Sequence, residues 1–201
     1  MSTDTKPALF LHCSPHGEHS HGYSLGKRTL AERLPTHGLL ERDLTADPLP
    51  PIGREYATAL TSGQVDHPVL AISETLIREL EQTDALVIAT PMHNFTVPAS
   101  LKLWIDLVLR IGRSFASTPE GKVGLIADRP TLVLVSSGGF HQGERARQPD
   151  FLTAYLRQAL LTIGITSVEF VYLEGMVFGP AAVDAALTAA HAAVPALRFP
   201  G

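Results

Sequence analysis

The sequence predicts an α/β fold in which a doubly wound sheet of five parallel strands carries helices on both faces. Short apolar runs alternate five times with longer segments of helical period, and no repeat interrupts them. Alternation of this kind pairs the strands in parallel through right-handed crossovers. The chain has 201 residues, 45% hydrophobic and 18% charged, which suits one domain with a sizeable core and excludes a disordered chain.

Five short apolar runs predict the strands. The first is ALFLHC, and it is followed by GLLERDL, ALVIA, TLVLVS and SVEFVYL. The strands are therefore expected at residues 8–13, 38–44, 85–89, 131–136 and 167–173.

Helices are expected where apolar residues recur at spacings of three and four. Residues 45–66 are instead rich in Pro, Gly and Thr, which predicts a long loop with one helical turn near residues 56–60. The predicted helices span about residues 23–34, 69–82, 101–111, 150–163 and 179–194.

The helix predicted over residues 101–111 is apolar at eight of its 11 positions. Its three polar residues recur at every fourth position, in one stripe that can pair charges. They are Lys102, Asp106 and Arg110. A helix that is apolar nearly all round is buried nearly all round. One side can face the sheet, so we expect the side with Leu103, Leu107 and Ile111 to contact a second subunit, in a homodimer.

Charge and cysteine content exclude several classes of protein. There are 16 Lys and Arg against 20 Asp and Glu, a net charge of −4, and no basic cluster, so nucleic acid is not an expected partner. No apolar stretch approaches the roughly 18 residues of a membrane span. The single cysteine, Cys13, cannot form an internal disulfide, which fits a reducing compartment. We therefore expect a soluble cytoplasmic protein, a single domain over residues 1–201.

The carboxyl ends of parallel strands meet at one edge of a sheet, where α/β proteins bind ligands. The loop after the first predicted strand, from Ser14 to Ser24, carries hydroxyls and glycines and leads into a helix. Residues Ser20 to Tyr23 could hold a phosphate monoester through hydroxyl and backbone N–H groups. The loop has neither G-x-G-x-x-G nor a P-loop pattern. A surface loop with a serine helix cap explains it equally well.

Two further loops follow the third and fourth predicted strands. The loop from Pro91 to Pro98 has a proline at each end, and Asn94 and backbone N–H groups could meet the edge of a flat heterocycle. In the loop from Ser136 to His141, consecutive glycines allow close approach to a ligand. Each loop also has an ordinary interpretation. The first could be a turn that caps the next helix, with Phe95 as a core residue, and the second could be a flexible turn.

Taken together, these loops resemble those of the FMN-dependent NADH azoreductases and quinone reductases, a family of flavodoxin-like proteins. The family has an early Ser-Pro and a serine-rich phosphate loop. It then has P-M-Y-N-F-x-x-P-x-x-L-K before a helix with Asp and R-x-G, then F-x-x-T-x-x-G-x-x-G-L, and finally S-x-G-G. The matching segments are Ser14-Pro15, Ser20 to Gly22, PMHNFTVPASLKLWIDLVLRIG (Pro91 to Gly112), FASTPEGKVGL (Phe115 to Leu125) and SSGGFH (Ser136 to His141). DLTADPLP (Asp43 to Pro50) is similar to the family's segment after the second strand.

The resemblance implies that FMN is the cofactor and places its contacts in these loops. The phosphate contacts it implies are Ser14, Ser20, His21 and Gly22. The residues it implies around the isoalloxazine are Met92, His93, Asn94, Phe95, Ser136, Ser137, Gly138 and Gly139.

The resemblance also implies a flavodoxin-like fold and an enzyme. Two electrons would pass from NADH or NADPH to a quinone, azo compound or nitroaromatic by a ping-pong mechanism, in a homodimer. His93 and His141 are candidates for relaying a proton or positioning an acceptor, although a histidine beside a pocket is more often part of its wall.

Three positions depart from the family pattern. His93 stands where the family usually has Tyr, and Ser117 replaces a frequent aromatic residue. Both are expected to alter the acceptor pocket. Gly22 stands where a second serine is common, which leaves the phosphate to backbone N–H groups and neighbouring hydroxyls.

Three other functions compete with this interpretation. Four histidines fall within ten residues, but their spacing matches no zinc site, so no metal is expected, and we take them as solvated loop residues. They are His12, His16, His19 and His21. A serine hydrolase would need a G-x-S-x-G nucleophile elbow after a strand and an acid to orient its histidine, but Ser136 is followed by Ser137, so no elbow is expected there. A non-catalytic flavodoxin-like electron carrier or FMN-binding protein stays open, although such carriers tend to be more acidic.

Overall fold

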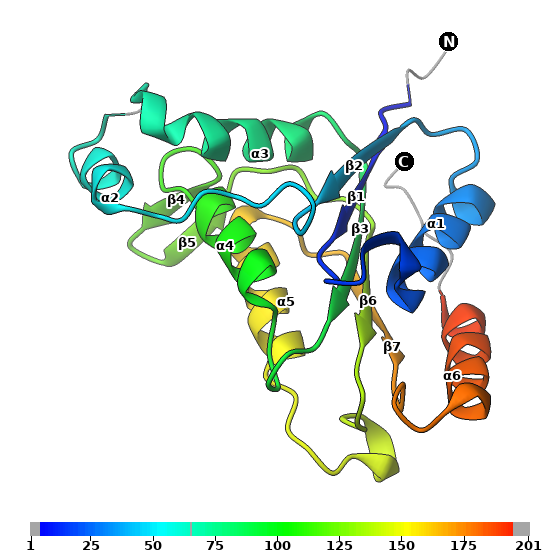
Figure 1. The fold of residues 1–201 in the computed structure, drawn as a ribbon. Coiled ribbons are helices and arrows are strands. Elements are labelled where there is room, and N and C mark those ends of the chain that lie inside the picture. Colours follow the sequence, from blue (N-terminus) through cyan, green and yellow to red (C-terminus); the bar gives the residue numbers. More distant parts are fainter. Residues whose placement is uncertain (1–4, 65, 195–201) are drawn as a thin grey trace.

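All five predicted strands pair in one parallel sheet, in the order β2-β1-β3-β6-β7 (Figure 1). The computed structural model describes residues 5–64 and 66–194. The strands are β1 (Ala8–His12), β2 (Leu39–Asp43), β3 (Ala85–Pro91), β6 (Thr131–Ser136) and β7 (Val168–Leu173). From β1 the chain goes first to one edge of the sheet and then back towards the other. The strand order therefore reverses between β1 and β3, the place where such sheets bind ligands.

Helices cover both faces of the sheet, as predicted (Figure 1). One face carries α1 (His21–Arg33) and α6 (Pro180–Ala193). The other carries α3 (Ala71–Glu81), α4 (Ala99–Val108) and α5 (Leu152–Ile163). Single 3₁₀ turns occur at Gly17–His19, Pro68–Leu70 and Gly143–Arg145.

Two apolar cores hold these layers together. Because side chains alternate along a strand, Leu9 and Leu11 of β1 pack under α3 to α5, whereas Ala8 and Phe10 pack under α1 and α6. Gly26 brings α1 close to the sheet, since a Cβ there would lie 2.7 Å from the Phe10 ring. This contact fixes the position of α1, whose first turn lies at the carboxyl edge of the sheet.

The helix predicted over residues 101–111 ends early, at Val108. The Ser114 hydroxyl donates to the Val108 carbonyl and accepts the Arg110 N–H at 2.9 Å, which ends the helix in a compact turn. The prediction that three charged residues share one stripe of this helix is wrong for one of them. Arg110 leaves the helix, is buried, and pairs with Glu74 of α3 at 2.7 Å.

The other two members of the stripe behave as predicted. Lys102 and Asp106 form an ion pair at 2.6 Å on the exposed side of α4. The pair fits the i, i+4 spacing.

The second partner expected for this helix is largely α3 of the same chain. Leu107 is only 1% exposed, and the Ser73 hydroxyl of α3 donates to its carbonyl at 2.6 Å. Of the three residues assigned to a subunit interface, only Ile111 is strongly exposed, at 57%, and it lies beyond the helix. This side of the helix therefore does not need a second subunit to cover it, so the helix gives no argument for a dimer.

One helix is longer than predicted, and one hairpin was not predicted. The 45–66 loop contains α2 (Arg54–Thr61), two turns where one was expected. A hairpin of β4 (Phe115–Thr118) and β5 (Gly121–Gly124) lies on α5. It fits there because Gly124 meets Gly164 at the end of α5, where a Cβ on Gly124 would lie 2.1 Å from the Gly164 nitrogen.

Over the described ranges, no helix has the length and apolar character needed to cross a bilayer.

Candidate functional site

A cavity of about 570 Å³ lies at the carboxyl ends of β1, β3 and β6, where the strand order reverses. The three loops singled out in the sequence all contribute to it. Its size falls in the range of sites that hold small molecules and cofactors.

At one end of this cavity, the first loop presents hydroxyl and backbone N–H groups that could bind an anion. Ser20 caps α1, and its hydroxyl oxygen accepts the Tyr23 N–H at 3.2 Å. The N–H groups of His21 and Gly22 precede the first intrahelical hydrogen bonds and point along the positive end of the helix dipole. Ser14 is buried beside them and its hydroxyl accepts the His16 N–H at 3.3 Å. Both serine hydroxyls keep a proton to donate.

The second loop is a tight turn held in a strained conformation. The N–H of His93 donates to the Thr96 carbonyl at 2.9 Å, and the N–H of Thr96 donates back at 3.0 Å. The two residues between them, Asn94 and Phe95, have φ of 47° and 73°, in the left-handed region. That region is unfavourable for a bulky side chain such as Phe95, and strain of this kind is common at functional sites.

The third loop brings backbone close to the cavity. Ser136, Ser137 and Gly138 line it, and the Ser137 hydroxyl donates to the Gly139 carbonyl at 2.9 Å. Gly139 is next to this wall but does not line the cavity, and a Cβ on it would meet the Gln148 side chain at 2.8 Å. The residue against the cavity is therefore Gly138.

The loops present a limited set of backbone donors. In the second and third loops, five N–H groups are already used inside the protein, those of Met92, His93, Thr96, Ser137 and His141. Four others donate to no acceptor within residues 5–64 and 66–194. They are the N–H groups of Asn94, Phe95, Gly138 and Gly139. These are the donors that remain for the edge of a bound ring.

Most predicted site residues meet at the cavity, and some do not. Those that line it are Ser14, Ser20, His21, Met92, His93, Ser136, Ser137 and Gly138. Those that lie next to it without lining it are Gly22, Asn94, Phe95 and Gly139. His141 is also absent from the lining, and its Nδ1 lies 3.0 Å from the Pro149 carbonyl. Of the two histidines considered for proton relay, only His93 borders the cavity.

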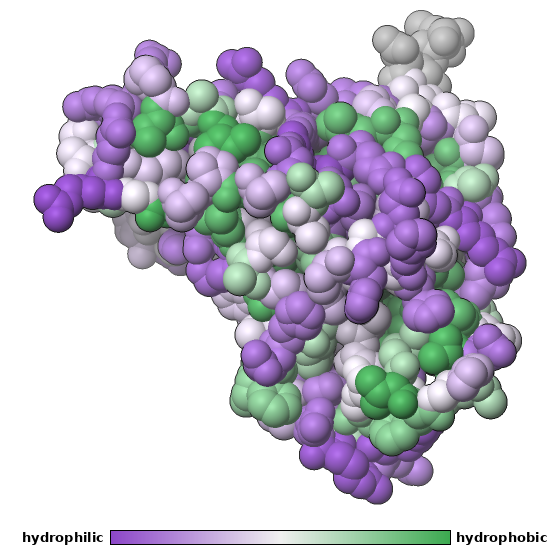
Figure 2. Space-filling model, in the orientation of Figure 1, coloured by the Kyte–Doolittle hydropathy of each residue, from purple (hydrophilic) through white to green (hydrophobic). Residues whose placement is uncertain are grey.

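The sequence interpretation missed a fourth wall, which follows β7. Met176 and Val177 line the cavity there, and Val177 is 74% exposed. The available signal was an apolar run, Met176 to Phe178, set between Gly175 and Gly179 after a strand. Figure 2 shows apolar surface over this segment between β7 and α6.

The clustered histidines divide into two groups. His16, His19 and His21 line the cavity, whereas His12 is buried in β1, with its Nε2 3.2 Å from Glu41 Oε1. Taking His12 as a solvated loop residue was therefore wrong. In the part of the chain that the structure describes, no three His, Cys, Asp or Glu side chains form a metal-binding group.

Cys13 lies directly before Ser14 and is buried. Burial raises the pKa of its thiol to about 12, and the Thr90 side chain only partly offsets this. A thiol with so high a pKa stays protonated at neutral pH and is a poor nucleophile. The geometry therefore supports binding through serines, backbone N–H groups and a helix N-terminus, with no activated side-chain nucleophile at Cys13.

Comparison with known proteins agrees with this geometry. The sequence model of a family described as having a flavodoxin-like fold matches residues 6–197. The chain is also 60% identical over 190 residues to an FMN-dependent NADH:quinone oxidoreductase of Pseudomonas fluorescens, covering 92% of each chain. The protein belongs to this flavodoxin-like family. A second relative within it, an FMN-dependent NADH:quinone oxidoreductase of Burkholderia lata, is 55% identical over 88% of this chain and 89% of its own length.

Solved structures of flavodoxin-like proteins share the architecture. An azoreductase of Bacillus anthracis superposes with a TM-score of 0.81 at 25% identity, covering 94% of this chain and 96% of that one. A second B. anthracis structure, an FMN-dependent NADH-azoreductase in complex with FMN, superposes with a TM-score of 0.79 at 20% identity, covering 94% and 97%. The second likeness supports the fold alone.

Proposed function

We propose that this protein is an FMN-dependent oxidoreductase that passes two electrons from NADH to a quinone, with azo compounds as further acceptors. The observation that carries the proposal is the 570 Å³ cavity, in which the start of α1 and three loops converge at the switch point of the sheet. The 60% identical relative is named an FMN-dependent NADH:quinone oxidoreductase. The proposal takes the chain as one domain, since β1, β2, β3, β6 and β7 form one parallel sheet.

The residues at the first loop fit the phosphate of FMN. Ser14 and Ser20 have hydroxyls to donate, and the N–H groups of His21 and Gly22 have no intrahelical acceptor. An anion at this position is also favoured by the helix dipole. Gly22 lies just behind the lining and would contribute through its backbone, which makes a second serine unnecessary there.

The residues at the second and third loops fit a flat ring. Met92 and Gly138 both line the cavity and carry no charge, and four backbone N–H groups remain as donors for a ring edge. Donors fixed by a strained turn and a glycine loop need no reorganisation when electron density on the ring increases. When bound, FMN supplies the redox chemistry, since it can accept a hydride and hand on both electrons.

His93 is the side chain at the cavity best placed to contact an acceptor. It is exposed, and its backbone is fixed by both hydrogen bonds to Thr96. It would position the acceptor or hold a proton near it. His141 is held in another segment by the Pro149 carbonyl and has no direct role in this proposal.

The proposal includes a cytoplasmic homodimer. The single cysteine and a soluble nicotinamide donor favour the cytoplasm. Phe151 and Phe95 are 61% and 41% exposed, and burial of these aromatic rings against a second copy of the chain would favour a homodimer. Their backbones are joined by a hydrogen bond of 3.0 Å, so the two residues lie on neighbouring segments beside the cavity. An apolar patch at the edge of a site is typical of an interface.

The function is tested with the purified protein. We expect a flavin absorption spectrum, release of FMN identified by mass, and steady NADH oxidation with benzoquinone in the absence of any partner protein. A protein that binds FMN without turnover would be an electron carrier or binding protein instead. A colourless protein that takes up no added FMN would refute the proposal.

The homodimer is tested separately by light scattering. Phe151→Asp should convert a dimer into a monomer, whereas Phe170→Asp, a change at a half-buried aromatic of β7, should not. A monomeric unmutated protein would refute this part of the proposal.

A further inference from the structure

The wall of the cavity formed after β6 and β7 depends on a segment outside the cavity. Residues 139–149, here called the flap, connect the third loop to the start of α5 and project beyond the carboxyl edge of the sheet (Figure 1). The flap contains one 3₁₀ turn, Gly143–Arg145, with no buried residue. The hydrogen bonds within the flap, such as that from the Arg147 N–H to the Phe140 carbonyl at 3.0 Å, are local, so its position against the sheet depends on contacts with other segments.

Glu174, the first residue after β7, provides such a contact. Its Oε1 accepts the N–H of His141 at 2.5 Å and the N–H of Gln142 at 3.1 Å. Two consecutive backbone N–H groups form a nest for an anion, and hydrogen bonds to a charged acceptor are stronger than those to a neutral one. The Glu174 side chain belongs to no ion pair within the described ranges, so the flap backbone is its main partner.

An aromatic contact holds the same two segments together. The Phe140 ring packs on Gly175, where a Cβ would lie 2.7 Å from the ring. It stacks on Phe178, with ring centres 5.6 Å apart and planes 7° from parallel. The Arg145 guanidinium lies 3.7 Å from the centre of the Phe140 ring.

These contacts continue to the cavity itself. The Ser137 N–H donates to the Leu173 carbonyl at 2.8 Å, and the Met176 N–H donates to the Ser137 carbonyl at 3.1 Å. A Cβ on Gly138 would lie 3.0 Å from the side chain of Val177, so the two segments are also in close contact where they line the cavity. The post-β6 and post-β7 segments therefore form one wall.

We propose that Glu174 is a positioning residue, whose carboxylate fixes the flap and thereby pre-forms the Ser136–Gly138 wall for FMN. The FMN part of this inference rests on the proposed function. Glu174 does not line the cavity; it lines a neighbouring hollow of about 410 Å³ with Phe140, Arg145 and Tyr172. It acts on the ligand only through the backbone that it holds.

The first test measures FMN binding to the apoprotein by fluorescence quenching. Glu174→Ala should raise the Kd for FMN about tenfold or more, because both hydrogen bonds to the flap are lost. Glu174→Gln keeps an acceptor oxygen at the same place and should restore most of the affinity. Glu169→Ala removes an exposed carboxylate from β7, the strand that precedes Glu174, and should bind FMN as the unmutated protein does.

The second test separates positioning from chemistry. Because Glu174 does not touch the reacting groups, kcat of Glu174→Ala at saturating FMN should lie within about twofold of the unmutated value, with the deficit confined to low FMN. A kcat that stays low at saturating FMN would overturn a purely positioning role. So would a loss of affinity that Glu174→Gln does not restore.

The third test measures how readily trypsin cleaves the flap in the absence of FMN. Arg145 and Arg147 are exposed trypsin sites within it. Brief digestion of the apoprotein should cleave Glu174→Ala at these sites at least about fivefold faster than Glu169→Ala, at similar melting temperatures. Equal cleavage would refute the attachment by Glu174. If the unmutated protein binds no FMN, the proposed function fails, and this digestion still decides whether Glu174 holds the flap.

Discussion

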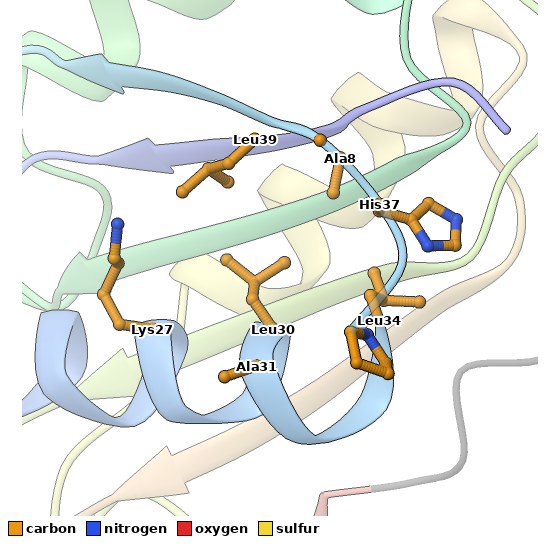
Figure 3. A pocket seen from close by; sticks show the side chains of 9 residues that line it. Ala8, Lys27, Leu30, Ala31, Leu34, His37 and Leu39 are labelled. Atoms are coloured by element: carbon orange, nitrogen blue, oxygen red, sulfur yellow. The ribbon is translucent and has the colours of Figure 1, made fainter.

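The two ends of the sheet each carry a hollow, and both hollows are bordered by the same helix, α1. The one at the amino end has a volume of about 310 Å³ and is lined by Leu30, Leu34 and Leu39 (Figure 3). Lys27 is the charged side chain at its border, and its ammonium is already paired with Glu41 at 2.9 Å. The one at the carboxyl end is larger and is bordered by Ser20 and the other polar groups of three loops.

The difference follows from the direction of α1. Its first turn, with free N–H groups and the positive end of the dipole, reaches the carboxyl end of the sheet. Its last turn, with carbonyl groups and the negative end of the dipole, borders the amino end. One helix therefore makes one end of the sheet suitable for an anionic cofactor and the other unsuitable, although both ends are hollow. A hollow alone does not mark a functional site.

The largest expected effect comes from filling each hollow in turn. Gly138→Val should weaken FMN binding about 100-fold, because the added side chain must displace Val177 from a 3.0 Å approach. Ala31→Val adds two carbon atoms in the amino-end hollow, against three for Gly138→Val, and should leave the Kd for FMN unchanged. Titration of both apoproteins measures this. Equal losses in the two variants would break the distinction between the two ends.

A smaller effect is expected when the ligand lacks the phosphate. Riboflavin should bind about 30-fold more weakly than FMN, since it loses charge-assisted hydrogen bonds at the start of α1. Fluorescence titration with each flavin gives the ratio. If the two flavins bind equally, the dipole of α1 contributes nothing to recognition.

Removing the helix cap should have a further, smaller effect. Ser20→Ala removes the acceptor for the Tyr23 N–H and a hydroxyl at the cavity, so FMN affinity should fall about tenfold and stability by about 1 kcal/mol. Ser24→Ala, whose hydroxyl only donates back to the Ser20 carbonyl at 3.3 Å, is the control. Thermal unfolding and FMN titration on both variants separate the two contributions. A Ser24→Ala protein with the same loss of affinity would contradict the role given to Ser20.

The smallest effect concerns Cys13, which is buried directly before Ser14 at the carboxyl-end cavity. Its pKa is raised from 9.0 to about 12 by burial, so the folded protein resists deprotonation while the unfolded chain ionises above pH 9. Its contribution to stability should be intact below pH 9 and decline as the pH rises from 9 towards 12. Cys13→Ala should show a flatter decline in melting temperature over that range, and native Cys13 should resist iodoacetamide at pH 8. Rapid alkylation of the folded protein would contradict its burial.

Much of the site could be read from the sequence because its residues follow strands directly. Ser14, Met92 and Ser136 come just after β1, at the end of β3 and at the end of β6, so strand prediction alone placed them at one edge. Gly139 and His141 could not be placed in the same way. Which side of a loop faces the ligand depends on contacts such as Gln148 with Gly139, and those join residues that no local pattern relates.

The early end of α4 has the same origin. Leu109 to Ile111 continue an apolar helical pattern, but Arg110 lies beyond the end of the helix and forms a partly buried ion pair with Glu74, 36 residues away. Local periodicity carries no information about that pair.

What the sequence by itself determined was the alternation of strands and helices, the parallel sheet and the loops at its carboxyl edge. Those features depend on spacing of apolar residues along the chain, which is local. Only the tertiary structure decided that α3 covers Leu107, that Met176 and Val177 complete the cavity, and that Glu174 holds the flap. These contacts join segments distant in sequence, and they form only once the sheet brings its strand ends together.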